Sequence, residues 1–587
     1  MKNRSKFLVV FFVILAAVIL YSLFDRMVIR REMYFKASYT DRAFVDLMEG
    51  LINEGVFVSD GDKVLINEDV LKGKGLRKST EERVRNSLSF LYVKKGRINF
   101  DKQSASIANS RTFADERVAR GRFLDRSGLV LAWSDIDERT WKQERKYAYG
   151  PQFYHIIGHW SPVFGKRNLE KELDDYLSGK RHLPIYRKTS DPLRNLQLGD
   201  DISLTLEANV QRRAYELLGS MRGAVIVIDV KTGEIITAVS TPSFDPSTRE
   251  NSKWREAFDG EARPVENRAF STLYPPGSTF KTVVASAWLQ RDKGQDDFKG
   301  EYTTVCTRGK NKYGISDIHV HGKGNLESAY ADSCNIFFSE IGVKLGRNIL
   351  DYAGRFGFNR KCNLIPQLKN SSYGAEKSIA FLRNGYSEED RGVREFDAAD
   401  FKRNPKLIAQ GAIGQNLVMA TPLQMAMVAA AVANRGLLFN PYIVKEIKTG
   451  DGKKVLLSAK PVEIGRVMKE ATALEMRKMM EEVMVKGTGK DVKKMYFENG
   501  GYTTVPINKN ERFVRVAGKT GTAEVGDRNG NGQVDPDEKP HSWFIGFAPA
   551  DSPRYAIAVI AENQGFGSLT AAPIAVDVLA EALNFGK

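Results

Sequence analysis

The segment Tyr274–Lys281, YPPGSTFK, decides which fold is predicted for this chain of 587 residues. The Pro-Pro-Gly triplet ends the preceding structure, and the following TFKTVVASAWL has apolar residues at helical spacing, so a helix is predicted to begin at Ser278. A serine there is most often an N-cap, and an N-cap helix favours acidic residues in its first turn. Lys281 stands in that turn instead. The helix dipole disfavours its charge, so we expect the pKa of the ammonium to be lowered.

Ser278 and Lys281 together predict nucleophilic chemistry. Positions i and i+3 share a helix face, so the amine is expected within hydrogen-bond reach of the hydroxyl. A neutral amine takes the serine proton, and backbone N–H groups at the helix start face a developing oxyanion. A nucleophile, a base and an oxyanion-binding site are the groups that serine acyl transfer requires. S-x-x-K occurs only here in the chain, although four residues alone are weak evidence.

Two further motifs follow in the chain. ADSCNIFF carries an S-x-N, Ser333–Asn335, inside a predicted helical stretch. K-T-G occurs three times, and the copies at Lys231–Gly233 and Lys448–Gly450 lie in predicted polar hairpin turns, where glycine supplies the turn conformation. The copy at Lys519–Gly521 lies in RVAGKTGTAE, which is predicted to be a strand.

The pattern of elements predicts one α/β domain over residues 200–587. GAVIVIDVKTGEIITAVSTP near its start and HSWFIGFAP and RYAIAVIAE near its end read as strands, with helices between them, so both ends are expected to meet in one sheet. ATPLQMAMVAAAVANRG is a predicted helix with Thr421 as N-cap, Pro422 in the first position and Gly436 at its stop. Upstream, GRFLDRSGLVLAW predicts a hairpin, and NLEKELDDYLSG predicts a helix that ends on Gly179.

The amino terminus predicts a membrane anchor. Phe7–Phe24 is an uncharged apolar stretch of 18 residues, and no small-residue cleavage site follows it. Cations flank this stretch almost equally on both sides, so they do not decide its orientation.

Charge and cysteine content restrict the partners. The formal net charge of +16 predicts either an anionic partner or a basic solvated surface, and no nucleic-acid-binding motif accompanies it. Three cysteines permit at most one internal disulfide. His319 and His321 form an H-x-H pair with Cys306 nearby, but no second ligand pair at zinc spacing follows, so no metal site is predicted there.

A calcium-binding loop is predicted near the carboxyl end of the chain. DRNGNGQVDPDE, residues 527–538, fits the calcium-loop pattern D-x-N-x-N-G-x5-E. The alternative is a polar connection between two strands, because no helices flank the loop. Calcium would be structural, and no cofactor is required for the chemistry. The predicted ligands are Asp527, Asn529, Asn531, Gln533, Asp535 and Glu538.

The three motifs in this order, with Thr522 and Ala523 after the last, resemble the penicillin-binding protein and serine β-lactamase superfamily. Roughly residues 200–587 resemble the transpeptidase domain of class B, monofunctional penicillin-binding proteins, and RGRFLDRSG and NLEKELDDYLSG resemble the pedestal of that family. The resemblance implies an elongated α+β pedestal, then an antiparallel sheet flanked by helices with an all-helical subdomain. GQN at Gly414–Asn416 departs from the family, which usually has a second glycine there.

The resemblance also implies roles for the motif residues in peptidoglycan cross-linking. Ser278 would attack the penultimate D-Ala carbonyl of a stem peptide and release the terminal D-Ala, with Lys281 as base. Ser333 would relay protons to the leaving amine, and Asn335 would hold the substrate amide. A neighbouring stem-peptide amine would take the acyl group, and β-lactams would acylate the same serine. The substrate carboxylate would be bound by the segment Lys519, Thr520, Gly521 and Thr522, and the backbone N–H groups of Ser278 and Thr522 would form the oxyanion hole.

Location, partner and alternatives follow from the same resemblance. Stem peptides lie outside the inner membrane, so the catalytic domain would be periplasmic behind a single-pass anchor, beside a membrane glycan polymerase. The resemblance thereby implies that residues 1–6 are a cytoplasmic tail and that residues 25–199 form a separate non-catalytic domain, within which residues 33–110 have no assigned role. A D,D-carboxypeptidase or β-lactamase would pass the same acyl group to water. A β-lactam sensor or a non-catalytic wall scaffold is the non-enzymatic alternative, although three intact motifs argue against a scaffold. Elongation or septation, the acceptor amine and the oligomeric state stay open.

Overall fold

A computed structural model describes most of the chain beyond residue 46, and it divides the chain into two compact units. Within the described ranges no helix is long and apolar enough to cross a membrane. The predicted anchor Phe7–Phe24 lies outside those ranges. The described residues are 47–60, 63–74, 84–85, 91–94, 97–100, 118–137, 143–161, 164–187, 196–248, 250–291, 302–368, 371–383, 394–492, 504–506, 513–525 and 535–585.

The first unit contains a small α/β element within residues 33–110. Its two hairpins are antiparallel, and Leu51, Phe57, Val64 and Leu71 are buried in a core of its own. The Asn67 side chain caps its helix by accepting from the Val70 amide at 3.3 Å. Its elements are β1 (Phe57–Asp60), β2 (Lys63–Ile66), α3 (Glu68–Gly73), β3 (Leu91–Lys94) and β4 (Arg97–Phe100).

The predicted hairpin of the pedestal is confirmed. Asp125 Oδ1 accepts from the amides of Ser127 and Leu129, which closes the turn between β6 and β7. The helix predicted to end at Gly179 forms as two short helices, α7 (Leu169–Glu172) and α8 (Asp174–Leu177). The six-stranded sheet has the order β26 (Val455–Ser458), β25 (Val444–Lys448), β13 (Asp201–Leu204), β6 (Phe123–Leu124), β7 (Val130–Ile136) and β8 (Gln143–Tyr147).

This sheet joins strands from both sides of residue 199, because β13 pairs with β6 on one edge and β25 on the other. The two K-T-G copies predicted to be turns lie at strand ends: Gly233 has φ +80° in the turn between β14 (Gly223–Asp229) and β15 (Ile235–Thr241), and Gly450 follows β25. The same part of the chain contains β5 (Val118–Ala119), α6 (Gly150–Ile157), β9 (His159–Ser161), β10 (Gly165–Arg167), β11 (Ile185–Arg187), β12 (Leu196–Leu198) and α10 (Asn251–Asp259).

A buried ion network holds the pedestal segments together. Arg120 Nε and Arg145 Nε donate to the two oxygens of Glu170, at 2.6 Å and 2.7 Å. Arg120 Nη1 also donates to Asp174 at 2.6 Å. Burial alone would raise the pKa of Glu170, but the charges of Arg145 and Arg120 outweigh it and the pKa is lowered. Two guanidinium groups are thus buried against two carboxylates.

The second sheet confirms the predicted α/β domain. β14, near the start of the domain, pairs along its whole length with β32, near its end, so that Gly223 lies opposite Ala561. All its strands are antiparallel to their neighbours. The order is β15 (Ile235–Thr241), β14 (Gly223–Asp229), β32 (Tyr555–Ala561), β31 (His541–Ala548) and β30 (Ala517–Ala523).

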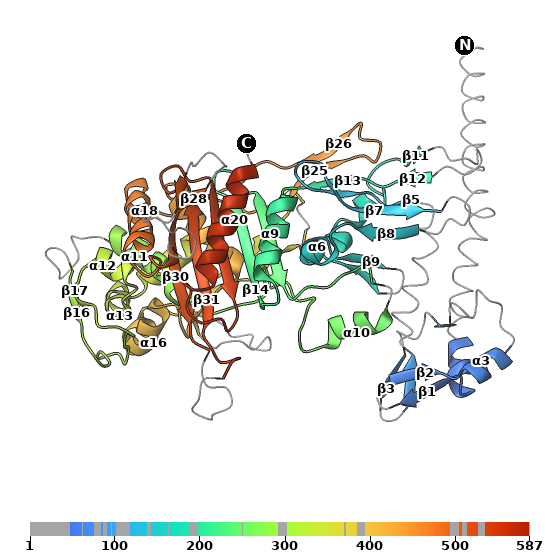
Figure 1. The fold of residues 1–587 in the computed structure, drawn as a ribbon, viewed down its shortest axis with the longest axis horizontal. Coiled ribbons are helices and arrows are strands. Elements are labelled where there is room, and N and C mark those ends of the chain that lie inside the picture. The colour runs from blue at the N-terminus through green and yellow to red at the C-terminus, as the bar shows by residue number, and fades with distance from the viewer. Residues whose placement is uncertain are drawn as a thin grey trace, which may run out of the picture. The chain divides into compact units, whose positions relative to one another are not determined.

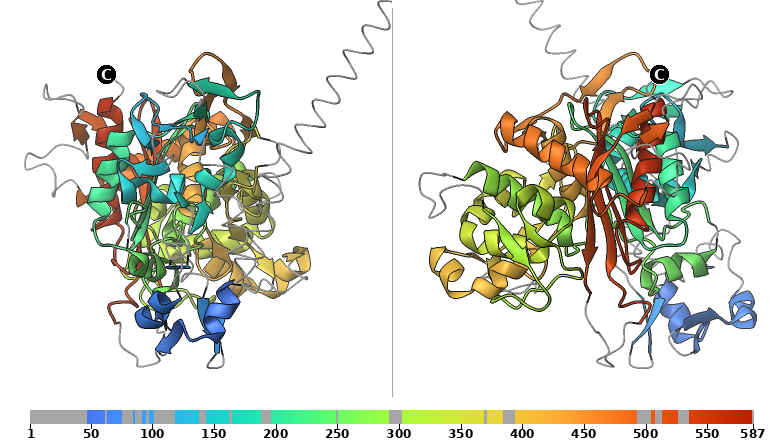
Figure 2. Two further views of the ribbon diagram at one scale, coloured as in Figure 1. Left: turned by 90° about the vertical axis from the view of Figure 1, so that its right-hand side faces the viewer. Right: turned by 60° about the vertical axis from the view of Figure 1, so that its left-hand side comes forward.

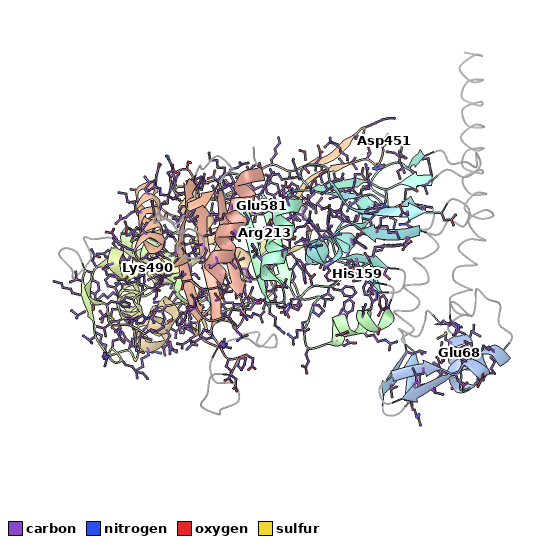
Figure 3. All side chains as sticks on the ribbon, in the orientation of Figure 1. Glu68, His159, Arg213, Asp451, Lys490 and Glu581 are labelled. Carbon is purple, nitrogen blue, oxygen red and sulfur yellow. The ribbon has the colours of Figure 1, made fainter. Side chains whose placement is uncertain are left out.

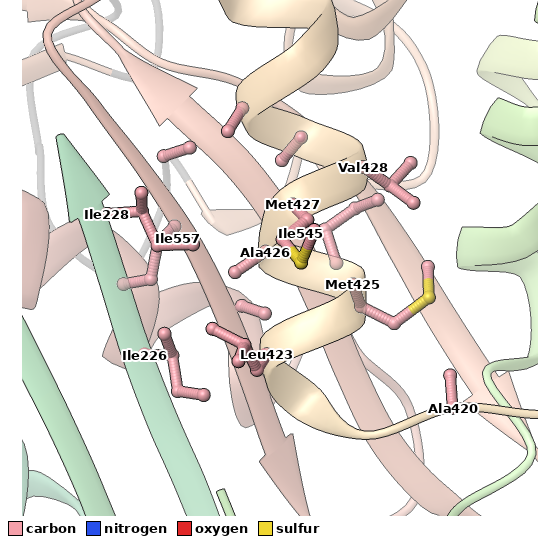
Figure 4. Packing of buried hydrophobic residues seen from close by; sticks show 14 of the residues in the cluster. Ile226, Ile228, Ala420, Leu423, Met425, Ala426, Met427, Val428, Ile545 and Ile557 are labelled. Atoms are coloured by element: carbon pink, nitrogen blue, oxygen red, sulfur yellow. The ribbon is translucent and has the colours of Figure 1, made fainter. Parts of the chain in front are cut away.

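Helices cover both faces of this sheet (Figures 1 and 2). On one face lie α9 (Ala208–Leu218) and α20 (Ala571–Phe585), which an ion pair between Arg213 and Asp577 joins at 3.1 Å. Figure 3 labels Arg213 and Glu581 on this helix pair. On the other face lies α17 (Pro422–Ala433), whose Leu423, Ala426 and Met427 pack on the isoleucines of β14, β31 and β32 (Figure 4). β14, β31 and β32 are consequently almost entirely buried.

The predicted caps of α17 are confirmed: Thr421 Oγ1 accepts from the Gln424 amide at 3.2 Å, Pro422 is the first helical residue, and Gly436 follows with φ +84°. The subdomain beside the sheet is mainly helical, but short two-stranded ribbons interrupt it, so the expectation of an all-helical subdomain is corrected. Its helices are α11 (Lys281–Gln290), α12 (Leu326–Ala331), α13 (Asn335–Leu345), α14 (Asn348–Arg355), α15 (Ala398–Arg403), α16 (Pro405–Ala412) and α18 (Glu470–Val485).

The two-stranded ribbons are antiparallel throughout. They pair β16 (Thr304–Cys306) with β17 (Gly322–Gly324), β18 (Cys362–Asn363) with β19 (Gly374–Ala375), β20 (Ile379–Ala380) with β23 (Val418–Met419), β21 (Leu382–Arg383) with β22 (Arg394–Glu395), β24 (Leu437–Phe439) with β27 (Glu463–Arg466), and β28 (Thr504–Pro506) with β29 (Phe513–Arg515).

Candidate active site

The predicted serine lies in a tight turn in front of α11. Gly277–Phe280 forms a 3₁₀ helix, and the α-helix begins at Lys281 rather than at Ser278. Gly277 has φ +54°, a conformation that glycine adopts without strain. Side chains three apart eclipse in a 3₁₀ helix, so the predicted shared face is retained. Ser278 is half-buried and Lys281 is completely buried.

Glycines bring this turn against β30. A Cβ on Gly277 would lie 2.7 Å from the Thr522 carbonyl oxygen, and one on Gly521 would lie 2.8 Å from the Thr279 methyl carbon. The Gly277 amide also donates to the Gly414 carbonyl at 2.9 Å. GQN, noted only as a departure from the family pattern, therefore supports the serine turn. No larger residue would allow these backbones to approach as closely.

The S-x-N motif faces Lys281 from the link between α12 and α13. Lys281 Nζ donates to the Ser333 carbonyl at 2.6 Å, to Ser333 Oγ at 3.3 Å and to Asn335 Oδ1 at 2.6 Å. The motif was expected inside a helix, but Ser333 has φ +60° and separates the two helices. This left-handed residue turns the chain so that both side chains reach one ammonium group.

Lys519 completes the arrangement from β30, where the predicted strand is confirmed. Its Nζ donates to Ser333 Oγ at 2.9 Å and to the Thr520 carbonyl at 3.1 Å. The Ser333 hydroxyl thus lies between the two ammonium groups of Lys281 and Lys519. Three motifs far apart in the sequence converge on this one oxygen.

Thr488 was missed by the sequence argument. Its hydroxyl hydrogen-bonds that of Thr520 at 2.5 Å, and its amide donates to the Ala331 carbonyl at 3.1 Å. It follows α18 between Gly487 and Gly489, and a Cβ on Gly487 would lie 2.2 Å from the Ala331 carbonyl oxygen. A Gly-Thr-Gly triplet after a helix was the available signal. Thr522 is half-buried on the same strand as Thr520.

Both lysines are buried cations with neutral partners. Burial lowers the pKa of Lys281 to about 8, against the opposing charges of Asp317 and Cys334. Burial and then the charge of Lys281 lower the pKa of Lys519 well below its usual value. Across the described residues neither ammonium lies within 4.0 Å of a carboxylate. The direction predicted for Lys281 is right, but its main cause is burial and not the helix dipole.

The hydrogen bond predicted between Ser278 and Lys281 is replaced by others. Among the described residues, Lys281 Nζ is bonded to the oxygens of Ser333 and Asn335, and the Ser278 hydroxyl has no hydrogen bond to it. The reason is that the link between α12 and α13 brings three oxygens to the ammonium group. Ser278 itself is half-buried.

Asp317 supports the S-x-N motif and was also missed. Its carboxylate accepts from the Asn335 amide at 2.6 Å and from the Ile336 amide at 3.0 Å, which caps α13. The thiols of Cys306 and Cys334 donate to the same carboxylate at 3.3 Å and 3.2 Å. The helix start that carries Asn335 is therefore fixed from behind by an acid and two thiols.

The predicted calcium loop falls mainly outside the described residues. Asp527, Asn529, Asn531 and Gln533 belong to that undescribed segment. At its end the Asp535 amide donates to Glu538 Oε2 at 3.3 Å, and Glu538 is buried. The calcium prediction stays a prediction.

Comparison with known proteins is consistent with this geometry. Residues 223–580 match the family described as the penicillin binding protein transpeptidase domain, and residues 120–198 match the penicillin binding protein A dimerisation domain. The peptidoglycan D,D-transpeptidase PbpA of Mycolicibacterium smegmatis is 28% identical over 504 residues, which are 82% of this chain and 92% of that protein.

Solved structures agree. A D,D-transpeptidase domain from Eggerthella lenta is 27% identical with a TM-score of 0.64, and the match covers 80% of this chain and 99% of that one. The penicillin G acyl-enzyme complex of penicillin-binding protein A from M. tuberculosis is 25% identical with a TM-score of 0.59, covering 79% of this chain and 99% of that one.

Proposed function

The chain belongs to the penicillin-binding protein transpeptidase family, and from this premise we propose that Ser278 is the nucleophile of a peptidoglycan D,D-transpeptidase. The enzyme is a serine-type acyltransferase of the class B penicillin-binding proteins, which cross-links stem peptides. The observation that supports these residue roles is that the ammonium groups of Lys281, from S-x-x-K, and Lys519, from K-T-G, both donate to the Ser333 hydroxyl of S-x-N.

Lys281 is the base in this proposal. Its pKa of about 8 leaves a useful fraction of neutral amine near pH 7, whereas an exposed lysine has almost none. Lys281 begins α11 directly after the serine turn, three residues after Ser278. The proton of Ser278 passes to this amine as the oxygen attacks the carbonyl of the penultimate D-Ala.

The remaining motif residues hold the substrate and the leaving group. Ser333 Oγ, bonded to both lysines, passes a proton to the departing D-Ala amine, and Asn335 holds the substrate amide. Lys519, with the hydroxyls of Thr520 and Thr522, binds the terminal carboxylate. The backbone N–H groups of Ser278 and Thr522 form the oxyanion hole, a role that the close approach of the serine turn to β30 supports.

Labelling with a fluorescent penicillin tests the nucleophile. We expect the wild-type chain to be labelled covalently and Ser278→Ala to be unlabelled. Ser271→Ala, which changes an exposed serine a few residues earlier, is the matched control and should label normally. Labelling of Ser278→Ala at the wild-type rate would remove the assignment.

The fate of the acyl group distinguishes transfer from hydrolysis. A stem-peptide substrate with a terminal D-Ala-D-Ala is incubated with and without an added acceptor amine. Transfer predicts a cross-linked product that increases with the amine. Release of the shortened peptide alone, at any amine concentration, would make the enzyme a carboxypeptidase.

We also propose the location and a partner. Phe7–Phe24 anchors the chain with its catalytic domain outside the cytoplasmic membrane, where stem peptides lie, and a membrane glycan polymerase lies beside it. Digestion of intact spheroplasts by an external protease should remove the catalytic domain. Its protection would refute this orientation, and failure to co-purify with a polymerase after crosslinking would refute the partner.

Loop 527–538 is proposed to bind Ca²⁺ on the strength of its sequence pattern. Calorimetry of the full chain should show binding that Asp527→Asn weakens. Absence of a heat signal at millimolar Ca²⁺ would remove this proposal and leave the catalytic one untouched.

A further inference from the structure

Four side chains behind the S-x-N motif form a cluster that the catalytic chemistry does not use. One potential ligand atom from each of Cys306, Asp317, His321 and Cys334 lies within 4.8 Å of the other three. Both cysteines are buried, the Asp317 side chain is 3% exposed and the His321 side chain is 18% exposed. The cluster includes the middle residue of Ser333–Asn335.

Four of the six separations between these atoms are close to those around a tetrahedral ion. Tetrahedral zinc with two sulfurs, a nitrogen and an oxygen at ordinary bond lengths places its ligand atoms about 3.3 to 3.8 Å apart. Asp317 Oδ2 lies 3.3 Å from the Cys306 sulfur, 3.2 Å from the Cys334 sulfur and 3.9 Å from His321 Nδ1. The Cys306 sulfur lies 3.5 Å from His321 Nδ1.

We propose that this cluster is a structural Zn²⁺ site, in which Cys306, Asp317, His321 and Cys334 are the four ligands. Two thiolates and an imidazole favour zinc over calcium or magnesium, which prefer oxygen ligands. Four protein ligands close the coordination shell, as in structural rather than catalytic zinc sites. Binding releases one proton from each thiol and leaves the site with a net charge of about −1.

The surroundings suit such an ion. Cys306, His321 and Cys334 line a small pocket together with Asp332 and Lys323, through which an ion can reach the ligands. The second oxygen of Asp317 accepts from the Asn335 amide, so the carboxylate is held in place from outside the ligand set. Cys306 is the last residue of β16, and His321 directly precedes β17, the strand that pairs with β16. β16 also contacts α13, so both residues lie near the start of that helix.

The ion would affect catalysis by fixing the position of the S-x-N segment. Cys334 lies between Ser333, whose hydroxyl contacts both lysines, and Asn335, whose oxygen contacts Lys281. Ser333 also holds a left-handed backbone conformation that is strained for a side-chain-bearing residue. A metal bond to Cys334 would fix this link, so that the four ligands are positioning residues and Ser278 keeps its nucleophilic role.

Metal content of the full-length chain tests the proposal. We expect elemental analysis to find about one zinc per chain, and Co²⁺ exchange to give the intense visible absorption of tetrahedral cobalt with a thiolate charge-transfer band. His321→Ala should lose the metal, whereas His319→Ala, which removes the exposed histidine of the same H-x-H, should keep it. Cys334→Ser and Cys362→Ser form the second pair, because Cys362 lies outside the cluster.

Three results would overturn the proposal. A wild-type chain without metal that gains no cobalt spectrum has no such site. An intact mass lower by two hydrogen atoms, with Cys306 and Cys334 in one disulfide-linked peptide, would show that the thiols have been oxidised to a disulfide. Equal metal content in His321→Ala and His319→Ala would place the ion elsewhere.

The positioning effect has its own readout. Removal of the metal by a chelator should lower the midpoint of thermal unfolding and slow acylation by a β-lactam, and added Zn²⁺ should restore both. Because Ser278→Ala blocks acylation but should keep its zinc, loss of the nucleophile and loss of the metal are distinguishable. Unchanged acylation in verified metal-free protein would contradict the positioning role.

Discussion

Two regions of this protein bury cationic side chains, and the partners of these side chains differ: carboxylates in one region and neutral oxygens in the other. In the pedestal, Arg120 and Arg145 are paired with Glu170, and Arg120 also with Asp174. In the catalytic site, the partners of Lys281 and Lys519 are carbonyl, amide and hydroxyl oxygens. The charges of Glu170 and Asp174 outweigh burial and raise the pKa of Arg120, whereas burial lowers the pKa of both lysines. A buried cation paired with carboxylates stays charged and stabilises the fold, whereas a buried lysine without such a pair loses its proton more easily and can act as a base.

Removal of the catalytic cation should give the largest effect. Lys281→Ala is expected to slow acylation by a β-lactam about 10³- to 10⁴-fold, the usual contribution of a positioned general base. Stability should change little, because removal of a buried cation with no described carboxylate within 4.0 Å offsets the cavity that the truncation leaves. Stopped-flow acylation and denaturant unfolding measure the two. A large loss of stability would contradict the claim that Lys281, unlike the pedestal arginines, does not stabilise the fold.

Removal of the pedestal acid should give the reverse pattern. Glu170→Gln keeps the shape but leaves two buried guanidinium groups short of one charge, so unfolding should cost about 3 kcal/mol less. The acylation rate of the folded protein should stay within about twofold of wild type. Lys171→Gln, at the exposed next position in the same helix, is the control and should change neither property. Equal unfolding midpoints for the two variants would contradict the compensation argument.

The repeated K-T-G offers a matched pair. Lys519→Ala should slow acylation about 10²-fold through loss of carboxylate binding and of a contact to Ser333. Lys231→Ala changes the same tripeptide in a surface turn and should have no measurable effect. Similar rates for the two variants would show that burial within β30 does not matter.

The smallest expected effect is the pH dependence. With a pKa of about 8 for Lys281, the neutral amine and the acylation rate should rise about tenfold from pH 7 to pH 9. Because the folded pKa lies below the unfolded one, the unfolded chain binds more protons between about pH 8 and 10.5, and stability should rise with pH there. Glu170 has the lowered pKa of a paired acid, so its contribution should be lost only below about pH 4.5. A flat rate profile from pH 7 to 9 would refute Lys281 as the base.

The sequence predicted the elements of the site better than their contacts. S-x-x-K, S-x-N and the third K-T-G were found from spacing, because residue types at short separations fix which side chains share a turn or a strand. The strand character of Lys519–Gly521 and the caps of α17 were likewise readable from local patterns.

What the sequence did not predict depends on chain segments that meet only in the folded protein. Asp317 is distant in the chain from the lysine whose pKa it affects, and its role as cap of α13 needs the ribbon that carries it. Thr488 is identified only by its contact with Thr520. The left-handed Ser333 was predicted as helix, because no glycine or asparagine marks that position.

The pairing of β14 with β32 has a consequence for how the protein is made. β14 can pair with β15 as soon as both are synthesised, but Asp229 lies opposite Tyr555 in the other pair, so the second edge of β14 finds its partner only when nearly the whole polypeptide has been made. Until then β14 presents one unpaired edge and a continuous apolar surface, a state that favours aggregation. Folding of this domain should therefore be slow and dominated by long-range contacts, and truncation before β32 should abolish it entirely.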